Sequence, residues 1–110
     1  MRVGIVTTWN ARCGICTYSA FLGEELQKAG IKVTILAERP DVLPAGIDPD
    51  FKSNLPYIEC WSRHKNFDNL LSVVKHKFDV VHIQHQFGLF PYEQNLTELL
   101  KELKKLGIKV

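Results

Sequence analysis

The chain has 110 residues, of which 45% are hydrophobic and 24% charged, and its formal net charge at pH 7 is only +2. This composition is typical of one soluble globular domain and excludes a disordered chain, and the weak charge gives no reason to expect a nucleic-acid partner. The first residues turn polar after Val6, so we expect neither a signal peptide nor a membrane span. We therefore predict a single cytoplasmic domain over residues 1–110, with its three cysteines reduced.

The first part of the sequence predicts a strand, a helix and a second strand. Residues 2–7 are almost continuously apolar and rich in β-branched side chains, which is typical of a strand covered on both faces. Helical spacing then predicts a helix over about residues 15–29, stopped by Gly30. Its expected apolar positions are Tyr18, Phe21, Leu22, Leu26 and Ala29. A tight turn leads to a second buried strand at residues 32–37, which we expect in the same sheet.

The rest of the chain continues the alternation after a proline-rich stretch. Residues 38–56 carry four of the five prolines and predict a long surface loop, and residues 57–61 predict a short third strand. The next helix should present Phe67, Leu70, Leu71, Val74 and Phe78 on one face. A fourth strand is predicted at residues 79–84. A last helix ending at Gly107 carries the stripe Leu96, Leu99, Leu100, Leu103 and Leu106. Residues 108–110 resemble the start of a fifth strand that is cut short, so we expect the chain to be part of a longer protein.

These elements predict an α/β fold, a Rossmann-like parallel sheet covered by helices in three layers. In such sheets ligands bind beyond the carboxyl ends of the strands, where loops lead into helix N-termini. The loop over residues 8–17 and the loop that follows the fourth strand are therefore the candidate sites.

Gly14 is the notable residue of the first loop. A glycine at the start of a helix lets the backbone approach a ligand, and the free N–H groups of the first turn favour an anion such as a phosphate. Neither the dinucleotide pattern G-x-G-x-x-G nor the P-loop pattern is present. A glycine needed only for the turn explains the residue equally well.

Histidines characterise the second loop and the strand before it. His82 and Gln84 should point to one face of the sheet, and we expect His82 to be a satisfied core residue. His85 lies at the end of the strand, where it could act as an acid, a base or a hydrogen-bond donor. The aromatic residues of the loop could line a pocket, although anchoring the loop is the commoner role.

Weaker interpretations concern the cysteines and one acid. Cys13 and Cys16 form a C-x-x-C pair at a helix start, the position of a redox dithiol, but no convincing facing cis-proline is present. Zinc would need further ligands such as Cys60 or His64, and we expect no metal and no cofactor. Glu38 stands where a Rossmann acid would hold a ribose, but without the glycine pattern we expect it to face solvent or to pair near the following arginine.

Three segments carry a family resemblance: MRVGIVTTWNARCGICTYSAFLGEEL, KVTILAE and DVVHIQHQFGLF. With the amphipathic helix that follows, they resemble the N-terminal domain of glycosyltransferase family four (group 1), over nearly the whole chain. The resemblance implies the acceptor-side half of a GT-B architecture, in which two Rossmann-like domains face each other and transfer a sugar from a nucleotide donor with retention. The nucleotide pocket and the paired glutamates of that family belong to the C-terminal domain, which is absent, so we expect this chain alone to be inactive.

The resemblance also implies roles for particular residues. It places His85, in HQFG, near the reacting sugar as the catalytic residue. It assigns donor-phosphate and acceptor binding to Arg12, Cys13, Gly14, Ile15, Thr17, Gln86, Phe87 and Gly88. The implied partners are the sugar donor and a sugar, lipid or other small acceptor. Weak peripheral membrane contact through the lysine-flanked last helix and self-association of the isolated domain are minor options. The alternatives of another class are a C-x-x-C dithiol oxidoreductase and a non-catalytic small-molecule-binding module.

Overall fold

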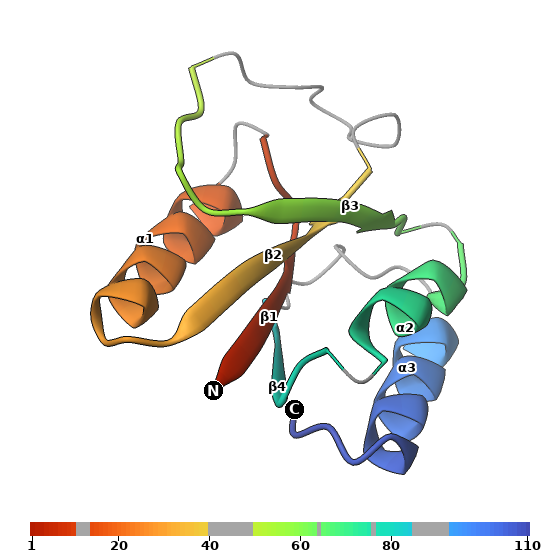
Figure 1. Ribbon diagram of the computed structural model, residues 1–110. Coiled ribbons are helices and arrows are strands. Elements are labelled where there is room, and N and C mark those ends of the chain that lie inside the picture. The colour runs from red at the N-terminus through yellow and green to blue at the C-terminus, as the bar shows by residue number, and fades with distance from the viewer. Residues whose placement is uncertain (11–13, 40–49, 64, 76, 85–92) are drawn as a thin grey trace.

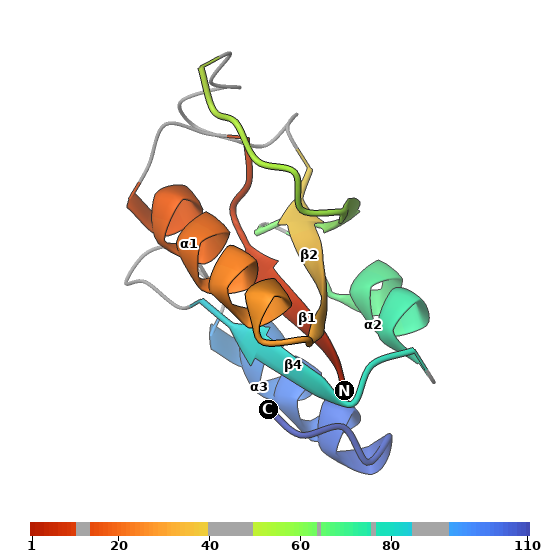
Figure 2. The same cartoon turned by 60° about the vertical axis from the view of Figure 1, so that its left-hand side comes forward.

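The computed structural model describes residues 1–10, 14–39, 50–63, 65–75, 77–84 and 93–110. In chain order its elements are β1 (Arg2–Thr7), α1 (Gly14–Lys28), β2 (Lys32–Glu38), β3 (Tyr57–Trp61), α2 (Asp68–Val74), β4 (Val80–Ile83) and α3 (Glu93–Lys105). The strands form one parallel sheet, with α1 on one face and α2 and α3 on the other (Figures 1 and 2). The predicted three-layer α/β architecture is confirmed.

The strand order explains where a ligand can bind. The sheet runs β3-β2-β1-β4, so the chain moves outward from β1 through β2 to β3 and then returns to the other side of β1. This reversal is the topological switch point of Rossmann-like sheets. Lys109 forms a parallel bridge with Val80 on the side of β4 away from β1, as the predicted start of a fifth strand requires.

The two faces of the sheet bury separate apolar clusters, which is why its central strands read as continuous apolar runs. The cluster under α1 includes Val3, Ile5, Val33, Ile35 and Leu55. The cluster under α2 and α3 includes Val6, Leu36, Trp61, Leu70, Val74, Leu99 and Leu103.

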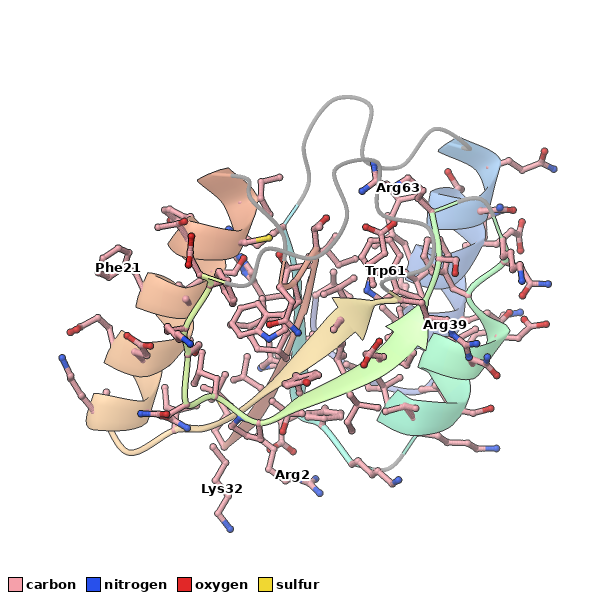
Figure 3. The ribbon with its side chains drawn as sticks, turned by 90° about the horizontal axis from the view of Figure 1, so that it is seen from above. Arg2, Phe21, Lys32, Arg39, Trp61 and Arg63 are labelled. Carbon is pink, nitrogen blue, oxygen red and sulfur yellow. The ribbon has the colours of Figure 1, made fainter. Side chains whose placement is uncertain are left out.

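Helix α1 approaches the sheet through small residues, and this corrects the predicted apolar face. Its buried residues are Cys16, Ser19, Ala20 and Gly23. A Cβ added at Gly23 would lie 2.6 Å from Leu55 Cδ1, so a larger residue there would require the Leu55 side chain to move. Tyr18 and Phe21 are instead 59% and 65% exposed. Figure 3 shows Phe21 on the outer side of α1.

Two further predictions on the other face need correction. Helix α2 ends at Val74, so Phe78 lies outside it, although its ring still packs against the same cluster. Leu100 was expected in the stripe of α3 and is 40% exposed. Among the described residues, no helix has the length and apolar character needed to cross a membrane.

Candidate functional site at the carboxyl ends of the strands

The chain that leaves β1 is held firmly before it reaches α1. The hydroxyls of Thr7 and Ser19 share a hydrogen bond of 2.8 Å, and the Cys16 thiol donates to the Thr8 carbonyl at 3.2 Å. Trp9 is buried and contacts Phe51 edge-to-face, with ring centroids 4.8 Å apart. These contacts join the end of β1 to the first turns of α1, so the position of the helix start is set by the sheet.

Gly14 is the first residue of α1 and is exposed. A Cβ at this position would meet nothing within 4 Å, and the described glycines with positive φ are Gly30 and Gly107, not Gly14. Neither packing nor backbone conformation therefore requires a glycine here. The first turn also contains no acidic side chain that would compete for its free N–H groups. The first turn of α1 therefore carries no negative side chain that would repel an anion.

A buried ion pair joins the next two strands at the same edge, and sequence reasoning missed it. The carboxylate of Glu38, at the end of β2, accepts from Arg63 Nε at 2.6 Å and from Arg63 Nη2 at 2.7 Å. The Glu38 side chain is 0% exposed and that of Arg63 13%. Thr8 Oγ1 donates to Glu38 Oε1 at 3.3 Å, so hydrogen bonds join the carboxyl ends of β1, β2 and β3.

The expectation that Glu38 faces solvent or pairs near Arg39 is therefore wrong. Its partner lies 25 residues along the chain, beyond β3, and only the pairing of β2 with β3 brings the two together. The sequence did indicate that Glu38 needs a partner, because an acid directly after the predicted buried strand loses its hydration unless another group binds it.

The end of β4 agrees with the expected alternation. His82 is half-buried, and its Nε2 lies 2.5 Å from Gln84 Oε1, so the two side chains share a face as predicted. His85, Gln86, Phe87 and Gly88 lie outside the described residues, as do Arg12 and Cys13.

Of the remaining predicted binding residues, Ile15 and Thr17 do not converge. Ile15 is partly buried and packs against the cluster beneath α2 and α3. Thr17 is exposed and lines a groove between α1 and residues 50–52, together with Phe21 and Phe51. Their separation follows from the helix, because positions two apart do not share a face.

The described cysteines are buried thiols. Cys16 is 0% exposed and Cys60 is 2% exposed. Burial raises the pKa of Cys60 from 9.0 to about 12, against a smaller lowering by the nearby Arg39. Among described residues, no group of three or more His, Cys, Asp or Glu side chains could hold a metal ion.

The raised pKa of Cys60 predicts a pH-dependent stability. The folded state favours the neutral thiol of Cys60. The contribution of this thiol to the free energy of unfolding is therefore complete below the unfolded pKa, and it is lost as the pH rises from about 9 toward 12. Urea unfolding at about pH 8 and about pH 10 measures this loss. We expect Cys60→Ala to lose less stability than the native chain over the same interval, whereas equal losses would contradict the assignment to Cys60.

The fold defines an α/β domain with Rossmann-like strand order, in which the order reverses beside β1. No family model, curated protein or solved structure matches the chain significantly.

Proposed function

We propose that this chain is the acceptor-side half of a retaining glycosyltransferase that uses a nucleotide-sugar donor. The observation that carries the proposal is that Gly14 is exposed at the start of a 15-residue helix. Neither packing nor a positive φ requires a glycine at this position. A bare backbone and free N–H groups suit the diphosphate of such a donor. The sequence resemblance assigns the same loop the same role.

The sheet supports this role by fixing the described residues on either side of residues 11–13. Thr7 is hydrogen-bonded to Ser19 of α1, and Thr8 is hydrogen-bonded to Glu38. Residues that are already fixed lose less entropy when they meet the diphosphate, so more of the contact energy is available for binding. In this proposal the chain contributes positioning and stabilises charge on the departing phosphate, while His85 contacts the sugar.

The proposal is tested with the product of the complete reading frame that contains residues 1–110. We expect a second Rossmann-like half after Val110, and release of nucleoside diphosphate when UDP-, GDP- or ADP-sugars are supplied with sugar acceptors. Gly14→Asp places a carboxylate at the helix start, where it repels the diphosphate, and should raise the donor KM at least about tenfold.

Gln27→Asp is the matched control, because it adds the same charge near the other end of α1 at an exposed position. It should leave the donor KM within about twofold, since the macrodipole acts only over the first and last turns. A complete protein that consumes no sugar nucleotide, or a Gly14→Asp variant with unchanged donor KM, would overturn the proposal.

A further inference from the structure

A small hollow lies away from α1, between the end of β3 and the start of α2. It has a volume of about 140 Å³, and its lining includes Arg39, Ser62 and Lys65. Pockets for whole small molecules usually measure about 300–1,000 Å³, so this hollow suits a single compact group. Figure 3 shows Arg39, Trp61 and Arg63 at this end of the sheet, with Arg2 and Lys32 at the opposite end.

Ser62 supplies an unused hydroxyl. The residue is 4% exposed, and its side chain makes no hydrogen bond to the described residues. Every fully enclosed side-chain oxygen and nitrogen of those residues has a partner. The Ser62 hydroxyl is therefore not fully enclosed, and Ser62 is one of the residues that line the hollow.

Arg39 and Lys65 line the same hollow as Ser62 and supply two positive charges. Arg39 and Lys65 form no ion pair with any described residue, in contrast to Arg63, which is bound to Glu38. Backbone hydrogen bonds hold both near Ser62. The Arg39 N–H donates to the Trp61 carbonyl at 2.8 Å, and the Lys65 N–H donates to the Ser62 carbonyl at 3.2 Å.

The remaining lining is polar and leaves the positive charge in excess. Asn66 and Asn69 contribute amide groups, and Asp68 is the only carboxylate among the described lining residues. Two cations against one carboxylate leave a net positive hollow with hydroxyl and amide donors, the combination that recognises a compact oxyanion.

From these contacts we propose that the hollow formed by Arg39, Ser62 and Lys65 is an anion site for a phosphate group, either inorganic phosphate or the terminal phosphate of a monoester. The site is independent of the proposed donor edge, because it lies beside the edge strand β3, two strands away from β1. Arg39 and Lys65 neutralise the charge, and the Ser62 hydroxyl donates to one phosphate oxygen.

Amide chemical shifts of the 110-residue chain test the site during titration with inorganic phosphate and, separately, with glycerol 3-phosphate at constant ionic strength. We expect saturable shifts centred on Ser62, Lys65 and Asn69. Arg39→Gln and Lys65→Gln should each weaken binding at least about tenfold, equivalent to about 1.4 kcal/mol. Ser62→Ala should weaken it about threefold, since one neutral hydrogen bond is lost.

Lys75→Gln is the control, because it removes an exposed lysine just beyond the other end of α2. It should change the dissociation constant by less than about twofold, as expected for a screened surface charge. Tighter binding of the monoester would identify an esterified phosphate as the ligand, and equal binding would identify the free ion. Shifts that rise linearly, that chloride reproduces, or that Lys75→Gln weakens as much as Lys65→Gln would overturn the proposal.

Discussion

Glu38→Gln is expected to lower the free energy of unfolding by about 3–5 kcal/mol, because it takes the Glu38 carboxylate away from the buried Arg63 guanidinium. The pair is bidentate, and the side chains are 0% and 13% exposed, so water cannot replace the lost contacts. Urea unfolding followed by tryptophan fluorescence measures the loss, since Trp61 is buried in the same cluster as the end of β2.

A double-mutant cycle separates the ion pair from simple loss of packing. The double variant Glu38→Met with Arg63→Met removes both charges and keeps apolar volume, so it should be more stable than either single variant. Glu98→Gln provides the surface control, because its partner Lys101 is 3.9 Å away and both side chains are more than half exposed. It should cost less than about 1 kcal/mol. Additive losses in the double variant would show that the two charges do not depend on each other.

His85→Ala in the complete protein is expected to reduce turnover by about a hundredfold or more, the usual contribution of a positioned acid, base or charged donor. The expectation rests on the proposed function and on the sequence position of His85, which is two residues after the last residue of β4 and lies outside the described residues. Steady-state kinetics with the preferred sugar nucleotide measure the change, and circular dichroism confirms that the variant is folded.

The neighbouring histidine offers a matched control. His82 lies within β4 and contacts Gln84, so His82→Gln should alter turnover by less than about fivefold. If His85→Ala turns over as fast as the native protein, His85 has no part in the mechanism, although Gly14 could still bind the donor.

The helix and strand positions could be predicted because their causes are local. Parallel strands buried on both faces need continuous apolar runs, and residues 2–7 and 32–37 have them. The place of Gly14 at the start of a helix could be predicted for the same reason, since polar loop residues give way there to a helical pattern. Helix α2 ends at Val74, earlier than predicted. The prediction extended too far because Phe78 fits the helical spacing of apolar residues although it lies outside the helix.

The contacts at the carboxyl edge of the sheet join residues that are far apart in the sequence, so no local pattern predicts them. The face of α1 that meets the sheet is its small-residue face, with Cys16, Ser19, Ala20 and Gly23 buried, whereas Tyr18 and Phe21 are left exposed. Glu38 and Arg63 meet only because β2 and β3 pair in parallel and end at the same edge. The sequence alone determined the order of the elements and the loops at the carboxyl edge, whereas only the tertiary structure decided which charges are buried there. The physical reason is that burial, unlike periodicity, is set by neighbours that lie far apart in the chain.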